Sequence, residues 1–237
     1  GKPAQAPPAA LHFNVAHSQS NMKVGTDAIL LGSWASLPTD GNFLDIGTGS
    51  GVIALMLAQK SENARITAID IDENSINEAR GNFKNSPWQN RLIAHHSSLQ
   101  DFAVNYDEKF DHIVSNPPFF AGHQTSIYPS RTKSRHTVYL NHGEFLILCG
   151  NLMHDESKLS VIIPTMLSDH FFNIAADQGL FATRILKVKP KAGQNSNRML
   201  IEFCKIKASA SAAELFIYSS DGSYTEEYQQ LTEDFYL

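Results

Sequence analysis

Two repeating patterns of apolar residues alternate along most of the chain. Short apolar runs such as NFLDI are typical of buried strands, whereas apolar residues three and four apart are typical of helices. Asp72 is the expected N-cap of the second helix of this series. The strands are expected at 42–46, 65–71, 91–95, 110–115, 158–163, 180–189 and 198–206. The helices are expected at 51–60, 73–85, 141–153 and 167–178.

This alternation of strands and helices predicts an α/β fold. Repeated βα units give a parallel sheet with helices on both faces, because each crossover returns over the sheet. The last two expected strands have no helix between them, which indicates an antiparallel edge hairpin. We therefore expect a doubly wound, Rossmann-like fold with a mostly parallel seven-stranded sheet.

The N-terminal part of the chain differs from this pattern. Residues 1–10 are rich in Pro and Ala and are expected to be disordered. Residues 11–39 form a segment that ends in a helix, for which Thr26 or Asp27 is a natural N-cap. Residues 40–237 then form the main domain. The apolar face of the N-terminal helix is expected to consist of Ile29, Leu30, Trp34 and Leu37.

Composition narrows the class of protein. The 237 residues are 42% apolar and 18% charged, as in a soluble globular protein, and no apolar run approaches the ~18 residues of a membrane span. Two cysteines are too few for a disulfide framework or a zinc site, so we expect a reducing cytoplasm and no metal. The net charge of −5 disfavours nucleic acid as a partner unless the chain carries a local basic patch.

A glycine-rich turn follows the first expected strand. Gly47, Gly49 and Gly51 allow positive φ and a close approach of a ligand to the backbone, over the N-terminus of the next helix. The third glycine comes one residue too early for the dinucleotide pattern G-x-G-x-x-G, and no Lys-Ser/Thr pair marks a phosphate loop. Asp45 ends the strand, where its charge opposes a pyrophosphate but suits an ammonium group. Asp70 ends the next strand and can accept hydrogen bonds from both hydroxyls of a ribose.

This D-x-G-x-G-x-G pattern with a later Asp resembles the Rossmann-like S-adenosylmethionine-dependent methyltransferases. The resemblance implies S-adenosylmethionine as the cofactor; a nicotinamide or flavin site, or a glycine turn without a ligand, are the alternatives. Ile71 beside Asp70, and Ser98 with Leu99 at the end of the third strand, would complete the cofactor site. Many methyltransferases have Asp at the position of Ser98, whose hydroxyl would bind the adenine amine more weakly than a carboxylate. Thr26 and Asp27 would close over the methionine end, unless their helix only packs against the domain.

The fourth strand is followed by the motif Asn116-Pro117-Pro118-Phe119. The two prolines remove two backbone donors, so the turn presents acceptors only. The Asn116 side-chain oxygen and the Pro117 carbonyl could accept both hydrogens of a planar NH₂ group and turn its lone pair toward a methyl donor. Phe119 offers a face for a flipped base. The alternative is a rigid turn without a catalytic role.

A basic segment at 122–137 follows this motif. It shows no apolar pattern, so we expect a long loop that becomes ordered on RNA, although its charge could be incidental. A basic loop beside a base pocket suits capture of an RNA backbone. The expected RNA-binding residues are Arg131, Lys133, Arg135 and His136. Four further cations would add to this surface if the last strands lie nearby: Lys187, Lys189, Lys191 and Arg198.

Further stretches resemble the bacterial tRNA1(Val) adenine-N6 methyltransferases. They are MKVGTDAILLG at 22–32, LDIGTGSG at 44–51, SPW at 86–88, SNPPFF at 115–120, RHT at 135–137 and the tail SYTEEYQQLTEDFYL. This resemblance implies methylation of the amino group of the adenine next to the anticodon, with tRNA as the partner and no membrane. The residues alone leave other planar amines open, namely an rRNA guanine amine or a protein glutamine, and also a binding module without catalysis. We expect a monomer.

Overall fold

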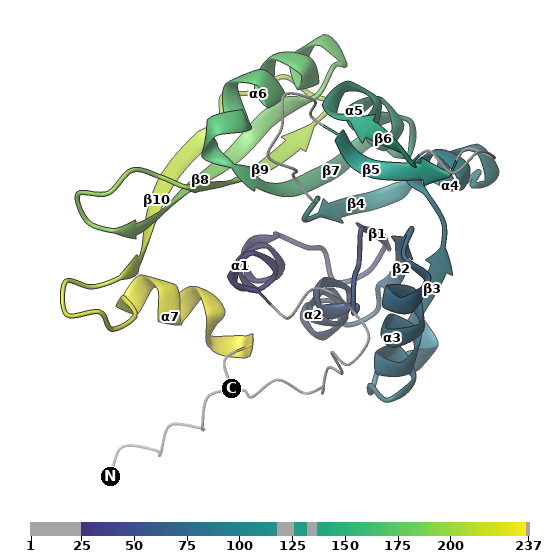
Figure 1. Ribbon diagram of the computed structural model, residues 1–237, viewed down its shortest axis with the longest axis horizontal. Coiled ribbons are helices and arrows are strands. Elements are labelled where there is room, and N and C mark those ends of the chain that lie inside the picture. The colour runs from purple at the N-terminus through teal and green to yellow at the C-terminus, as the bar shows by residue number, and fades with distance from the viewer. Residues whose placement is uncertain (1–24, 118–125, 132–136, 236–237) are drawn as a thin grey trace.

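The computed structural model describes residues 25–117, 126–131 and 137–235. Its centre is an eight-stranded sheet with the strand order β10-β8-β9-β7-β4-β1-β2-β3 (Figure 1). The strands of this sheet are β1 (Asn42–Ile46), β2 (Arg65–Asp70), β3 (Leu92–His96), β4 (Phe110–Ser115), β7 (Met153–Pro164), β8 (Phe181–Lys191), β9 (Arg198–Cys204) and β10 (Ser211–Tyr218).

The order and direction of the strands confirm the doubly wound fold. β1 pairs in parallel with β2 on one side and with β4 on the other, and β4 pairs in parallel with β7. β9 is antiparallel to both of its neighbours, β7 and β8, as expected for a final hairpin. This hairpin is not the edge of the sheet, because β10 adds in parallel to β8.

β10 is therefore an eighth strand where seven were expected. Its sequence, SAAELFIY, begins with small residues of weak strand propensity. Only Leu215 and Ile217 are buried, so the strand carries a short alternation that is easily missed.

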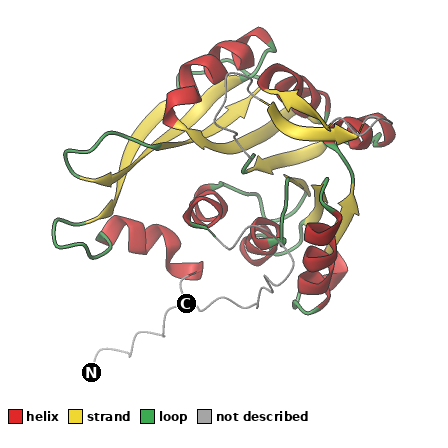
Figure 2. Ribbon diagram, viewed as in Figure 1, coloured by secondary structure: helices red, strands yellow, loops and turns green. Residues whose placement is uncertain are grey.

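Seven helices cover both faces of the sheet within the described residues (Figure 2). One face carries α1, α2, α3 and α7, and the other carries α4, α5 and α6. None of these helices is long and apolar enough to cross a membrane. Their bounds are α1 (Thr26–Trp34), α2 (Val52–Lys60), α3 (Glu73–Lys84), α4 (Leu99–Asn105), α5 (His142–Asn151), α6 (Ser168–Asp177) and α7 (Glu226–Thr232), with short 3₁₀ turns η1 (Gln89–Arg91), η2 (Thr165–Leu167) and η3 (Glu233–Phe235).

The starts of the helices test the expected caps. Asp72 caps α3 as expected, because its Oδ2 accepts a hydrogen bond from the Ser75 N–H at 2.8 Å. The expectation of Thr26 or Asp27 as the N-cap of α1 is wrong: the N-cap is Gly25, and no side chain caps the helix. Asp27 is in the first turn of α1, where its carboxylate is paired with Arg198 at 2.9 Å.

The basic segment contains a hairpin where a loop was expected. β5 (Ser126–Arg131) and β6 (Thr137–Asn141) form a separate two-stranded antiparallel sheet. The sequences SIYPSR and TVYLN are rich in β-branched and aromatic residues, which favour strands. The expectation of a loop without regular structure is therefore wrong for these two stretches. Residues 132–136 lie outside the described part of the chain.

Candidate functional site

The expected site residues lie at the ends of neighbouring parallel strands. β3, β2, β1 and β4 are adjacent in that order and point the same way, so the segments after them share one edge of the sheet. Ligands of open α/β sheets bind at this edge. The structure thus brings together the glycine turn after β1, Asp70 at the end of β2, Ser98 after β3 and Asn116 after β4.

The glycine turn has a backbone shape that requires glycine. Gly47, Gly49 and Gly51 have φ values of 72°, 56° and 89°, a region that side chains other than that of glycine rarely adopt. A Cβ on Gly51 would come within 2.6 Å of the Phe83 ring, so this glycine also lets α3 pack closely. A Cβ on Gly49 would meet no atom of the described residues within 4 Å. The turn is therefore packed on its protein side and open at Gly49, which suits a ligand lying against the backbone.

Asp70 joins the end of β2 to this turn. Its Oδ2 accepts a hydrogen bond from the Gly49 N–H at 2.8 Å, and its Oδ1 accepts one from the Asp72 N–H at 2.9 Å. Burial raises the pKa of Asp70, although these two hydrogen bonds oppose the shift. Each carboxylate oxygen retains an acceptor position. Asp70 can thus hold the turn and still accept hydrogen bonds from a ribose.

Asp45 is a buried carboxyl beneath the same turn. Its Oδ2 accepts a hydrogen bond from Thr48 Oγ1 at 2.7 Å, whereas Oδ1 is buried without a hydrogen-bond partner among the described residues. Burial raises the pKa of Asp45 to about 7; the Thr48 hydrogen bond opposes this shift and the negative charge of Asp70 adds to it. A buried acceptor without a donor is costly, and the ammonium group of a ligand would supply one.

Ser98 and Leu99 follow β3 at the next position along the edge. Ser98 Oγ accepts a hydrogen bond from the Asp101 N–H at 3.0 Å, so Ser98 is the N-cap of α4. Leu99 is buried in the core on the α4–α5–α6 face. Ile71 is partly buried, and its carbonyl is 2.9 Å from His96 Nε2. A direct role of these three residues in cofactor binding stays a prediction.

Two residues that sequence reasoning missed support the site, Asn82 at the glycine turn and His96 at the segment after β2. Asn82 of α3 donates from Nδ2 to the Ser50 carbonyl at 2.8 Å and is buried. His96, at the end of β3, contacts the carbonyl of Ile71 beside Asp70. Asn82 interrupts the apolar face of α3, and a buried polar position of this kind is the signal that could have identified it.

Asn116 and Pro117 continue directly from β4 at this edge. Asn116 is partly exposed and Pro117 is buried. The preceding Ser115 donates from Oγ to the Ile46 carbonyl at 2.9 Å, which fixes the end of β4 beside the start of the glycine turn. Pro118 and Phe119 lie outside the described residues.

For the other expected site residues, the structure gives a position without a contact to the site or does not describe them. Thr26 is exposed at the start of α1, and Asp27 pairs with Arg198, so their role toward a cofactor stays a prediction. The backbone of Arg131 ends β5. The remaining expected RNA-binding residues, Lys133, Arg135 and His136, lie outside the described part of the chain.

Comparison with known proteins identifies the family. Residues 12–161 match the methyltransferase small domain family. The tRNA1(Val) (adenine(37)-N6)-methyltransferase of Aeromonas hydrophila is 39% identical over 226 residues, covering 95% of this chain and 94% of the relative. The protein of the same name from Actinobacillus succinogenes is 38% identical, with the same coverage.

Solved structures agree on the fold. A predicted O-methyltransferase from Agrobacterium tumefaciens superposes with a TM-score of 0.68 at 18% identity, covering 90% of this chain and 98% of that one. A methyltransferase from Pyrococcus furiosus superposes with a TM-score of 0.57 at 21% identity, covering 81% and 89%. At these identities the likeness concerns the fold alone. The sequence relatives confirm the expected methyltransferase, and the chain belongs to the tRNA1(Val) (adenine(37)-N6)-methyltransferase family.

Proposed function

We propose that this protein transfers a methyl group from S-adenosylmethionine to the exocyclic N6 amine of adenine 37 in tRNA1(Val). The observation that carries the proposal is the position of Asn116 after β4, next to the glycine turn, Asp45 and Asp70. Relatives that are 38–39% identical over nearly the whole chain bear the name of this activity.

The residues at the edge of the sheet fit the three parts of this cofactor. Asp70 would accept hydrogen bonds from the ribose hydroxyls, and the open side of Gly49 leaves room for the ligand to lie against the backbone. The buried Oδ1 of Asp45 would accept a hydrogen bond from the ammonium group of the methionine part. When bound, S-adenosylmethionine supplies an electrophilic methyl group on a sulfonium. Ser98 stands nearest the expected adenine end, but its Oγ already caps α4.

Asn116 and Pro117 would bind the amine that is methylated. The Asn116 side-chain oxygen and the Pro117 carbonyl would each accept one hydrogen of the NH₂ group. Two acceptors so placed favour a pyramidal nitrogen, whose lone pair is no longer delocalised into the ring. They would also orient that lone pair toward the sulfonium methyl group, and this positioning would supply much of the rate. The amine becomes acidic as its new bond forms, so its proton can leave to water without a strong general base.

The test is a methylation assay with labelled S-adenosylmethionine and tRNA1(Val) made by transcription in vitro. We expect one N6-methyladenosine per tRNA, detected by mass spectrometry of nucleosides, and no product with a tRNA in which guanosine replaces adenosine 37. Bulk rRNA and a mixture of cellular proteins serve as competing substrates. A methylated guanine amine or glutamine, with unmodified tRNA, would contradict the proposal, because the Asn-Pro-Pro-Phe motif alone selects a planar amine and not its carrier.

A further inference from the structure

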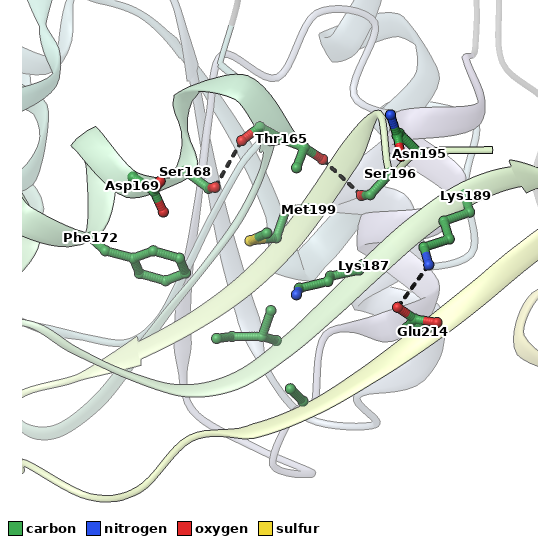
Figure 3. A pocket seen from close by; sticks show the side chains of 12 residues that line it. Thr165, Ser168, Asp169, Phe172, Lys187, Lys189, Asn195, Ser196, Met199 and Glu214 are labelled. Carbon is green, nitrogen blue, oxygen red and sulfur yellow. Dashed lines mark hydrogen bonds and ion pairs between the residues drawn. The ribbon is translucent and has the colours of Figure 1, made fainter. Parts of the chain in front are cut away.

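A hollow of about 580 Å³ opens on the α6 face of the sheet, between the η2–α6 turn and strands β8, β9 and β10. Phe172 and Met199 contribute apolar surface to it, and Asp169, Lys187 and Ser196 contribute polar groups. Figure 3 shows the Lys187 amine and the Phe172 ring pointing into the same space, with Met199 between them. The hollow therefore combines an aromatic face, a cation and a hydrogen-bond acceptor.

The hollow lies at the same edge of the sheet as Asn116. β8 is parallel to β7 because both are antiparallel to β9, and β7 is parallel to β4. The C-terminal half of β8, with Lys187, thus points toward the edge where Asn116 follows β4. Three strand spacings separate β4 from β8 in the sheet, which is about 14 Å at ~4.8 Å each. A chain of a few nucleotides can span that distance.

Lys187 is the lysine of this hollow that a ligand can reach, although it lies beside Glu214 of β10 and its charge helps to lower the pKa of that carboxylate. Lys189, which also lines the hollow, is paired with Glu214 at 2.9 Å. Lys187 is exposed, and it forms no ion pair within the part of the chain that the structure describes. In a protein of net charge −5, an unpaired lysine on the substrate edge is a specific place for a phosphate.

The rim beside the hollow presents an apolar side chain to solvent. Met166 of η2 is 88% exposed. Its turn is held in place because Thr165 Oγ1 is 2.8 Å from Ser196 Oγ and the Thr165 N–H donates to the Asn197 carbonyl at 3.2 Å. A large apolar side chain exposed on an anchored turn that borders the hollow is suited to contact with an unstacked base.

We propose that this hollow holds one nucleotide of the substrate tRNA other than the methylated adenosine. The proposal rests on the proposed function and names a second contact surface for the same substrate. The phosphate meets Lys187, the base lies against Phe172 and Met199, and Asp169 accepts a hydrogen bond from an amino group of the base. The carboxylates of Asp169 and Glu214 disfavour a free phosphate ion in this hollow. A nucleotide offers its phosphate to Lys187 and an amino group of its base to Asp169.

The first test compares Lys187→Glu with Lys207→Glu. Both variants change the net charge equally, but Lys207 follows the C-terminal end of β9, which lies at the opposite edge of the sheet. We expect Lys187→Glu to raise the Kd for unmodified tRNA1(Val) about tenfold and to reduce the slope of log affinity against log salt by about 0.7. Lys207→Glu should change the Kd less than twofold. Equal affinities of the two variants would overturn the proposal.

A second variant, Phe172→Leu, removes the aromatic face but retains an apolar side chain. We expect its Kd for tRNA to rise about fivefold or more, the scale of a lost stacking face, while its affinity for S-adenosylhomocysteine stays that of the wild type. Wild-type affinity for tRNA would overturn the placement of the base. The proposed function is checked separately, because it fails only if the wild-type protein does not methylate tRNA.

Discussion

The Gly49 N–H and the Asp70 carboxylate form a 2.8 Å hydrogen bond between residues that lie 21 positions apart in the chain. The bond joins the turn after β1 to the end of β2, so the residue proposed to bind the ribose also holds the turn against which the ligand lies. A substitution at Asp70 therefore has two separable effects, one on the stability of the ligand-free protein and one on the affinity for the ligand.

Asp70→Ala tests both effects. Loss of the acceptor for the Gly49 N–H should lower the free energy of unfolding of the ligand-free protein by about 1 kcal/mol. Loss of charge-assisted hydrogen bonds to the ribose should weaken S-adenosylhomocysteine binding at least about tenfold. Urea unfolding measures the first quantity and calorimetry the second.

Asp72→Ala is the matched control for this experiment. Asp72 caps α3 through the Ser75 N–H, so its loss should also cost about 1 kcal/mol of stability. Its side chain has no proposed contact with the ligand, and the affinity for S-adenosylhomocysteine should stay within twofold of the wild type. If both variants lost the same affinity, the ribose assignment of Asp70 would be wrong.

The fold could be predicted from the chain because its signals are local. Apolar runs, the glycine turn and the N-cap at Asp72 each depend on a few adjacent residues. β10 was missed because its first residues are small and exposed, so its place in the sheet comes from pairing with β8. The hairpin of β5 and β6 was missed because its polar and basic residues hide a short strand pattern.

The candidate site could be predicted where residues end adjacent strands. Parallel strands end at one edge of the sheet, and this rule alone predicts that Asp45, the glycine turn, Asp70 and Asn116 lie together. The residues that hold the site in place do so through contacts between segments distant in the chain, and such contacts leave only a weak pattern in the sequence. Asp27 pairs with Arg198, 171 positions away, and Asn82 binds the Ser50 carbonyl 32 positions away.

The raised pKa of Asp45, about 7, predicts a pH-dependent stability. The unfolded carboxyl ionises near pH 4 but the buried one only near pH 7, so the folded state binds more protons between these values. The contribution of Asp45 to stability should therefore fall as the pH rises from about 4 to about 7 and level off above, opposite in sign to the contributions of the buried His112 and His142, whose pKa values burial lowers. The shift sets an upper bound of about 4 kcal/mol for this loss. Urea unfolding at several pH values measures it.

Asp45→Asn removes the titration and serves as the reference protein. The wild-type protein should lose stability relative to this variant between pH 4 and 7, and parallel curves would show that Asp45 does not ionise as proposed. The affinity for the cofactor should change with pH in the opposite direction, because only the ionised carboxylate attracts an ammonium group. The affinity for S-adenosylhomocysteine should rise between pH 6 and 8 in the wild type and stay nearly flat in the variant.

Asn116→Ala tests the proposed binding of the target amine. We expect the turnover number with tRNA to fall about a hundredfold or more, as for loss of one preorganised polar group. The affinity for S-adenosylhomocysteine should be nearly unchanged, because Asn116 follows β4 and not the glycine turn. Asn105→Ala, an exposed position at the end of α4, is the control and should keep wild-type turnover. Near-normal turnover of Asn116→Ala would show that the motif is only a turn.

The last prediction concerns the buried Glu202 under α1. Glu202 is 1% exposed, and its carboxylate is paired with Arg184 at 3.2 Å and accepts a hydrogen bond from Thr183 Oγ1 at 2.9 Å. The Arg184 guanidinium also lies 4.3 Å from the ring centroid of Trp34 in α1. Arg184 thus connects the sheet to the N-terminal helix through a charge pair and a cation–π contact.

Arg184→Ala should lower the free energy of unfolding by about 2–3 kcal/mol, because a buried carboxylate loses its nearest cation and Trp34 loses its stacking partner. Arg184→Lys keeps the charge but not the planar group, so it should recover only part of that loss. Arg65→Ala, at an exposed position at the start of β2, should cost less than about 0.5 kcal/mol. Urea unfolding at pH 7 measures all three. A loss in Arg184→Ala no larger than that in Arg65→Ala would mean that Lys158, 3.6 Å from Glu202, neutralises this carboxylate by itself.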